Sequence, residues 1–151
     1  MKYRYILKKI SFLLLFFFVF SACENFSDNT PSGYTESVKT LNGTWKIVKA
    51  SRNGTDMTSM FDFTKFRLHF NSDNTYIVEN YIPFIVKTSG TWVLDDPRYP
   101  YNLVFKEYGS EENLTTGFSY PIVNGKRQVS LSFSPGCHSN IYTYVFEQVL
   151  N

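Results

Sequence analysis

The sequence contains few of the residues that catalytic and metal sites require. It has two cysteines and two histidines in 151 residues. A Ser-His-Asp arrangement, a glycine-rich phosphate loop and a CxxC motif are all missing, and each of these would carry a recognisable chemistry. The small number of cysteines also excludes a disulfide framework. We therefore expect a protein that is not an enzyme, with no catalytic residue, no cofactor and no bound metal.

Three short motifs keep a site of that kind open as an alternative. Cys137-His138 is a neighbouring cysteine and histidine, but a nucleophile–base pair or a metal site needs further convergent groups. Asp95-Asp96 and Glu111-Glu112 offer oxygen ligands for calcium, and neither has the regular spacing of a calcium loop. We interpret the cysteine as a loop thiol, and Asp95-Asp96 as part of a turn.

The sequence has no apolar run long enough to span a bilayer. The longest run covers residues 10–22, which is thirteen residues, whereas a spanning helix needs about 20. Four basic residues and no acidic residue precede it, and it ends in Phe-Ser-Ala before Cys23. This order predicts a secretory signal peptide over residues 1–22, cleaved before Cys23, with lipid on that cysteine.

The signal resembles those of bacterial lipoproteins, which implies that Cys23 is diacylated and N-acylated. The partner implied is a membrane, bound through the lipid on Cys23, and several acyl chains give stable anchoring. We expect the protein in the cell envelope of a Gram-negative bacterium, at the outer membrane. Both a periplasmic and a surface-facing orientation stay open. With Cys23 lipidated, Cys137 has no intramolecular cysteine partner.

The sequence of the mature chain also has no block of basic residues. Four of the fifteen Lys and Arg residues lie in the predicted signal, so eleven remain against thirteen Asp and Glu. Binding to nucleic-acid phosphates needs clustered Lys and Arg, so we expect no nucleic-acid partner. The 129 residues after the signal suffice for one domain with one core.

The chain after Cys23 divides into a polar segment and a patterned domain. Residues 23–40 have no apolar period, which indicates an acylated cysteine followed by a flexible tether. Within residues 41–151, apolar and polar residues alternate as in half-buried strands. The segments that we expect to form strands are 43–50, 65–70, 75–81, 84–94, 101–105, 114–123, 128–134 and 141–149.

The connections between these segments predict the topology. The segments are separated by short turns, of which Asn124-Gly125 is a strong two-residue hairpin signal. Eight consecutive strands with hairpin-like connections favour an all-β, antiparallel up-and-down barrel over a sandwich. We also expect one short helix over Met57 to Phe61, with Thr55 or Asp56 as its N-cap.

Two stretches carry a family resemblance. Gly43-Thr44-Trp45 opens the first expected strand and resembles the Gly-x-Trp motif of lipocalins, in which the tryptophan plugs one end of the barrel. Together with the signal, the tether and the later stretch from Gly90 to Pro100, the chain resembles uncharacterised lipocalin-like lipoproteins of gut bacteria. The resemblance covers residues 41–150 and implies a lipocalin-like eight-stranded barrel with a short helix near one mouth. It implies no activity.

Abundant aromatic residues suggest two functions for such a barrel. The leading hypothesis is the binding of a small apolar or amphipathic ligand at the mouth near the expected helix and the loop before Tyr101. The expected lining residues are Trp45, Met60, Phe61, Trp92, Tyr99 and Tyr101. The alternative is a solid barrel whose loops dock an envelope protein or a glycan. An eight-stranded barrel can be filled by side chains or hold one small ligand, so interior volume distinguishes the two.

Overall fold

The computed structural model describes residues 33, 35–82, 86–136 and 139–150. The predicted signal peptide, Cys23, Phe84 and the pair Cys137-His138 lie outside the described residues. The chain divides into two units at residue 35, and the unit Glu36–Asn151 contains all of the strands. Within the described part of the chain, there is no helix that is long and apolar enough to cross a membrane.

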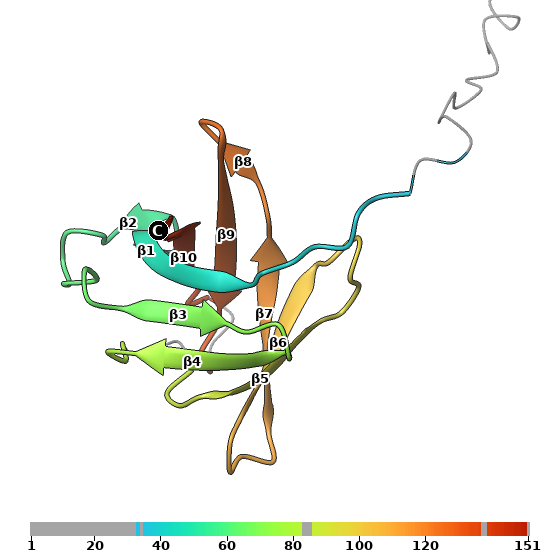
Figure 1. Cartoon of the computed structure of the whole chain (residues 1–151). Coiled ribbons are helices and arrows are strands. Elements are labelled where there is room, and N and C mark those ends of the chain that lie inside the picture. Colours follow the sequence, from blue (N-terminus) through green and yellow to red (C-terminus); the bar gives the residue numbers. More distant parts are fainter. Residues whose placement is uncertain (1–32, 34, 83–85, 137–138, 151) are drawn as a thin grey trace, which may run out of the picture. The chain divides into compact units, whose positions relative to one another are not determined.

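Ten strands make up the described fold (Figure 1). Their bounds are β1 Gly43–Arg52, β2 Thr55–Asp56, β3 Arg67–Phe70, β4 Thr75–Glu79, β5 Gly90–Leu94, β6 Asn102–Glu107, β7 Asn113–Ser119, β8 Ile122–Val123, β9 Lys126–Phe133 and β10 Tyr142–Gln148. Eight of them pair antiparallel in the order β1, β3, β4, β5, β6, β7, β9 and β10. β10 pairs with both β9 and β1, which closes the sheet. The prediction of an all-β fold with an eight-stranded antiparallel barrel is confirmed.

The expected short helix is not formed: the described residues contain no helix, and residues 57–61 form turns. Asp56 Oδ1 accepts a hydrogen bond from the Thr58 amide at 2.8 Å, and Thr58 Oγ1 accepts one from the Ala50 amide at 3.0 Å. The segment therefore bonds to β1 and also forms a turn of its own, in which the Met60 amide donates to the Met57 carbonyl at 3.0 Å. A single helical turn has too few internal hydrogen bonds to offset the cost of nucleation.

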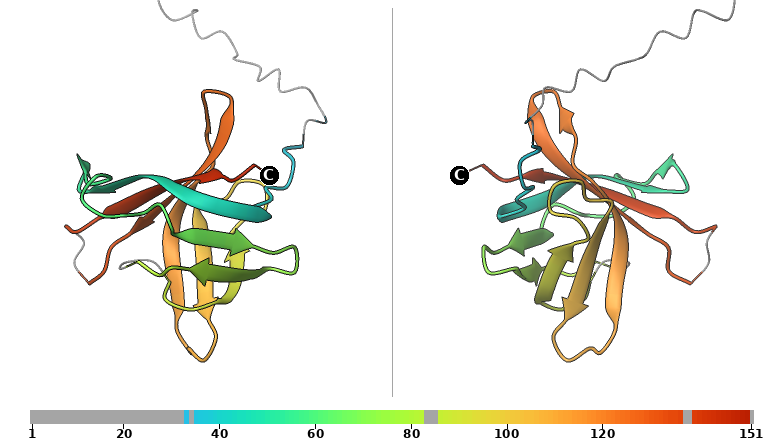
Figure 2. Two further views of the ribbon diagram at one scale, coloured as in Figure 1. Left: turned by 60° about the vertical axis from the view of Figure 1, so that its left-hand side comes forward. Right: turned by 90° about the vertical axis from the view of Figure 1, so that its right-hand side faces the viewer.

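Because consecutive strands run in opposite directions, the connections gather at two ends of the barrel. The proximal end consists of residues 36–42, which lead into β1, and of the connections that follow β3, β5 and β7. The distal end consists of the connections that follow β1, β4, β6 and β9. Figure 2 shows the β8–β9 hairpin and the β6–β7 turn projecting in opposite directions.

Apolar side chains fill the barrel interior. The predicted alternation of residues 65–70 is confirmed, since Phe66, Leu68 and Phe70 are buried. The largest fully buried apolar side chains are those of Leu41, Trp45, Phe66, Leu68, Tyr76, Leu103, Phe105, Val129, Leu131 and Phe146. The Tyr76 and Phe105 rings lie 4.9 Å apart in an edge-to-face arrangement, which aromatic pairs favour. The buried side chains of the described residues lie between positions 41 and 146, and residues 24–151 retain all of them.

The expected strand over residues 84–94 is shorter in the structure. β5 begins at Gly90, and Thr88, which lay within the expected strand, is exposed. The Glu107 carboxylate accepts hydrogen bonds from the amides of Lys87 and Thr88. These amides are therefore bound to a side chain and are not part of a β ladder.

Two other residues of the expected strands, Tyr101 and Ile122, are exposed. Tyr101 is 78% exposed because it precedes β6, where its amide donates a hydrogen bond to Asp95 Oδ1 at 3.0 Å. Ile122 is 62% exposed because the expected strand 114–123 is interrupted: β7 ends at Ser119, and Pro121 separates it from β8. A proline cannot donate to a β ladder. β8 therefore belongs to the projecting hairpin and not to the barrel wall.

Candidate functional site

The six expected lining residues do not form one pocket. Trp45 and Trp92 are buried side chains of the core. Met60 and Phe61 are exposed in the distal connection after β1, at 70% and 55%. Tyr99 and Tyr101 are exposed in the proximal connection after β5. These two loops were expected to lie together at one mouth of the barrel. They lie at opposite ends, because the strands between them are antiparallel and odd in number.

The two tryptophans have different surroundings. Trp45 Nε1 donates a hydrogen bond to the Leu41 carbonyl at 2.7 Å, and its ring lies 6.4 Å from that of Tyr120. It closes the proximal end. The Trp92 ring packs edge-on against Phe70, with 5.2 Å between the centroids. Its Nε1 atom is buried and has no hydrogen-bond partner among the described residues.

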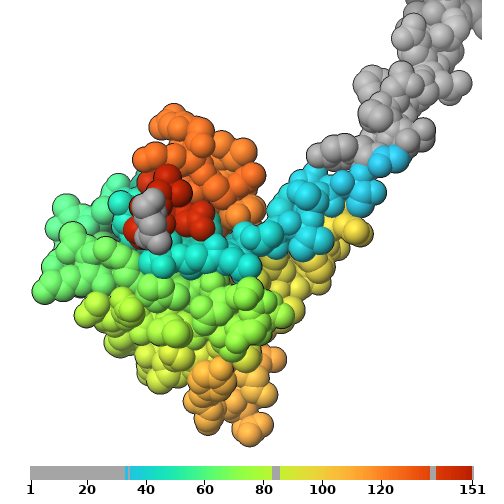
Figure 3. All heavy atoms as spheres, in the orientation of Figure 1, coloured from blue at the N-terminus to red at the C-terminus, as the bar shows by residue number. Residues whose placement is uncertain are grey.

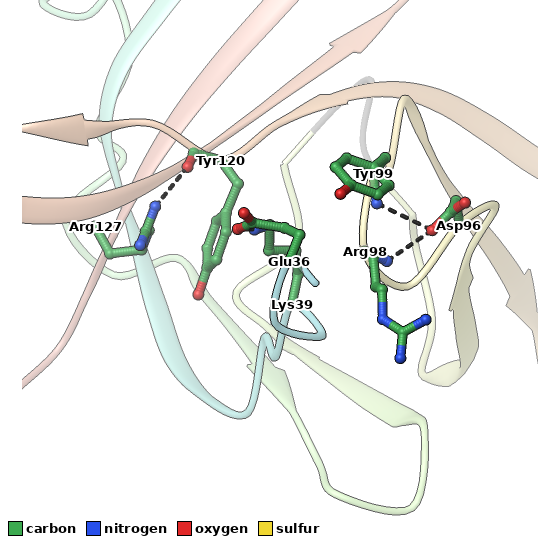
Figure 4. A network of polar contacts seen from close by, with 7 residues as sticks. All are labelled: Glu36, Lys39, Asp96, Arg98, Tyr99, Tyr120 and Arg127. Carbon is green, nitrogen blue, oxygen red and sulfur yellow. Dashed lines mark hydrogen bonds and ion pairs between the residues drawn. The ribbon is translucent and has the colours of Figure 1, made fainter. Parts of the chain in front are cut away.

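The proximal loop after β5 is held by two aspartates, as Figure 4 shows for Asp96. Asp96 Oδ1 accepts hydrogen bonds from the amides of Arg98 and Tyr99, at 2.7 and 3.0 Å. Hydrogen bonds from the Tyr99 and Arg98 amides lower the pKa of Asp96, and bonds from the Asn102, Tyr101 and Asp96 groups lower that of Asp95. Both carboxylates are therefore used in turn formation. Within the described ranges, no group of three His, Cys, Asp or Glu residues could hold a metal ion.

A pocket of about 470 Å³ opens at the distal end. It lies among the connections that follow β4, β6 and β9. The residues around it are Tyr81, Val86, Lys87, Phe105, Glu107, Ser110, Glu112, Asn113, Leu114 and Pro135. Its innermost side chains, Val86 and Phe105, are buried, whereas Leu114 is 39% exposed on the wall. The pocket therefore has an apolar floor, with charged groups from Lys87, Glu107 and Glu112 around it.

Glu107 determines the shape of this pocket. By accepting hydrogen bonds from two backbone amides of the segment before β5, it holds that segment against the end of β6. Burial is the main cause of the raised pKa of the nearby Tyr76 hydroxyl, and the Glu107 charge adds to the effect. The carboxylate thus has a structural role, and Lys87 and Glu112 are the other charged side chains that line the pocket.

Sequence reasoning missed most of this pocket. Glu112 was considered only as half of an acidic pair that could bind calcium, and Asn113 lay between two expected strands. Val86, Lys87 and Leu114 fell within expected regular strands. The useful signals were Pro83 and Gly90, which mark the stretch where a regular ladder is interrupted.

One comparison with known proteins identifies a family. A family model described as "Domain of unknown function (DUF5004)" matches residues 22–147. No curated protein and no solved structure matches the chain.

Proposed function

The chain belongs to the DUF5004 family, and we propose that it is a non-catalytic, lipid-anchored protein of the Gram-negative cell envelope that binds a small apolar or amphipathic molecule at the distal end of its barrel. The signal-like order of residues 1–23 supports the anchor. The distal pocket supports the ligand. The outer membrane is the location that we propose.

The volume and lining of the distal pocket carry this proposal. Its volume of about 470 Å³ falls within the range of roughly 300–1,000 Å³ that is typical of small-molecule sites. Such sites combine apolar walls with a few polar groups that orient the ligand. Here Phe105 and Val86 would contact the apolar part of the ligand, while Lys87 and Glu112 at the rim would face its polar part. Because side chains fill the barrel interior, we expect the ligand in the distal pocket.

Native mass spectrometry tests the proposal. Residues 24–151, purified without detergent and incubated with envelope lipid extract, should carry a small molecule that denaturation releases. Leu114→Arg should remove this extra mass, because it introduces a long charged side chain at a half-exposed wall position. Val93→Arg is the matched control, since Val93 is 56% exposed on β5 and does not line the pocket. A bare polypeptide mass for the wild type, or equal loss in both variants, would contradict the proposal.

Docking of an envelope protein or a glycan is the second candidate function. It is favoured by Tyr99 and Tyr101, which are 59% and 78% exposed in a loop that the two aspartates hold in place. Tyrosine is enriched at protein interfaces. If docking is the function, Tyr99→Ala with Tyr101→Ala should abolish capture of a defined envelope partner and leave the distal pocket intact.

A further inference from the structure

The β8–β9 hairpin exposes apolar side chains at the proximal end. Ile122 pairs with Arg127 and Val123 with Lys126, and the turn residues Asn124 and Gly125 both have positive φ. Ile122 is 62% and Val123 40% exposed. Figure 3 shows this hairpin standing out from the body of the domain. Two neighbouring exposed apolar residues therefore lie beside two basic residues on a projecting element.

A basic pocket lies beside this hairpin. Its volume is about 360 Å³, and its lining residues are Lys46, Gly125, Lys126, Arg127, Glu147, Gln148, Val149 and Leu150. Lys126 Nζ lies 3.8 Å from Glu147 Oε2, and the other oxygen of that carboxylate accepts a hydrogen bond from Gln128 Nε2 at 3.0 Å. The lining of this pocket thus has three cationic side chains and one carboxylate, and that carboxylate already binds Lys126 and Gln128, which leaves an excess of positive charge.

Tyr120 fixes the position of one of these cations. Arg127 Nη1 donates a hydrogen bond to the Tyr120 carbonyl at 2.8 Å, and the guanidinium lies 4.5 Å from the centre of the Tyr120 ring (Figure 4). The Tyr120 hydroxyl donates to the Thr40 carbonyl at 2.7 Å. The same ring therefore connects the hairpin to the segment that leads into β1. A side chain held in this way loses less entropy on binding an anion.

We propose that the proximal end docks on an anionic membrane surface. Lys46, Lys126 and Arg127 bind a lipid phosphate in the basic pocket, and the tip of the hairpin places Ile122 and Val123 in the interfacial layer. Basic residues near a membrane gain from its negative surface potential, and adjacent apolar side chains add hydrophobic burial. Neither a free anion nor a purely apolar partner would use both features.

The position of the hairpin in the chain fits a membrane partner. The chain leads into β1 at the same end, and Tyr120 links the two elements. The segment between Cys23 and Leu41 spans at most about 60 Å when extended, so lipid on Cys23 would hold the proximal end close to the bilayer. This inference goes beyond the proposed ligand binding and uses none of the residues of the distal pocket.

Vesicle co-sedimentation of residues 24–151 tests the inference, because this chain lacks Cys23 and carries no lipid. We expect binding to vesicles of phosphatidylglycerol and phosphatidylethanolamine that weakens as salt is added, and little binding to phosphatidylcholine vesicles. Lys46→Glu with Lys126→Glu should lower partitioning at least about tenfold, since each basic residue contributes several-fold. Ile122→Ser with Val123→Ser should lower it by about fivefold through lost apolar burial.

Matched variants separate this surface from general electrostatics. Lys49→Glu with Lys65→Glu makes the same charge change at two exposed lysines outside the basic pocket, and Val93→Ser removes an exposed apolar residue from the barrel wall. Both matched variants should bind anionic vesicles as the wild type does, and all variants should keep the wild-type unfolding midpoint.

Four results would overturn the inference: no vesicle binding, equal binding to phosphatidylcholine, equal losses in the matched variants, or complete competition by millimolar inorganic phosphate, which would indicate a small-anion site. The mass-spectrometric ligand assay on the Lys46→Glu, Lys126→Glu variant should match the wild type. The two proposals can therefore fail separately.

Discussion

The two ends of the barrel are formed by the same strands and are closed in different ways. At the proximal end, Lys39 donates a backbone hydrogen bond to the Pro97 carbonyl at 2.7 Å, and Leu41 and Trp45 are fully buried. At the distal end, Met57 and Phe63 of the connection after β1 are buried, and Phe63 packs edge-on against Tyr144. The distal pocket lies elsewhere, among the connections after β4, β6 and β9.

This difference shows how a barrel with a filled interior can still have an open pocket at one end. Where a chain segment crosses the end and bonds to loops on both sides, as residues 39–41 do, the end is sealed. Where a side chain holds a connection in place, as Glu107 does, a pocket stays open beside the core. Substitutions at the two ends should therefore have different consequences for stability.

The largest effect should come from removing the residue that closes the proximal end. Trp45→Ala should lower the free energy of unfolding by about 3–5 kcal/mol, as expected for a large side chain deleted from a packed core. It loses the hydrogen bond to Leu41 and the contact with Tyr120. Leu114→Ala, at the half-exposed wall of the distal pocket, should cost about 1 kcal/mol or less. Urea denaturation measures both, and equal losses would refute the contrast between a sealed and an open end.

A smaller loss of stability should result from substitution of Gly90 and should be absent on substitution of Gly117. A Cβ atom at Gly90 would lie 2.0 Å from the Lys106 carbonyl oxygen, which is backbone and cannot swing away. Gly90→Ala should therefore cost about 1–3 kcal/mol through overpacking. At Gly117, the nearest atom to an added Cβ is Ser132 Cβ at 3.7 Å, which is ordinary contact. Gly117→Ala should be neutral to slightly stabilising, and thermal unfolding of the two variants side by side checks this.

The smallest effect should be a pH response of the proximal loop. The lowered pKa of Asp96 means that its contribution to stability is present above the aspartate pKa of the unfolded chain, about 3.9, and is lost as the pH falls through the lower folded value. Amide resonances of Arg98 and Tyr99 should titrate with a midpoint below 3.9. In Asp96→Asn, whose amide oxygen can still accept both hydrogen bonds, this titration should vanish. A midpoint at or above 3.9 in the wild type would count against the hydrogen-bonded turn.

Much of the fold could be predicted because the strand signal is local. Alternation in residues 65–70 and 142–146 correctly identified inward and outward faces, and Asn124-Gly125 correctly located a hairpin turn. Errors occurred where a side chain replaced a backbone partner. Glu107 binds the amides before β5, Asp95 binds that of Tyr101, and Asp56 binds that of Thr58. The alternation of apolar and polar residues does not show which side chain will bind which backbone amide.

The candidate site was the least predictable part. Each aromatic residue that was expected to line a ligand site was chosen for its size and for its place in a loop or strand. Neither property indicates at which end of the barrel the residue lies. Met60 and Tyr99 lie at opposite ends because an odd number of strands separates their loops. The residues that do surround the distal pocket come from the connections after three different strands.

The sequence by itself determined the class of this protein: periodic apolar residues and short turns specify an antiparallel barrel, because a period of two can bury only one face of a strand. The tertiary structure alone decided which end is sealed and which is open. Closure depends on contacts between residues far apart in the chain, such as Tyr120 with Thr40 and Glu107 with Thr88. No periodicity encodes these contacts, because a local pattern does not specify which distant residue each side chain meets.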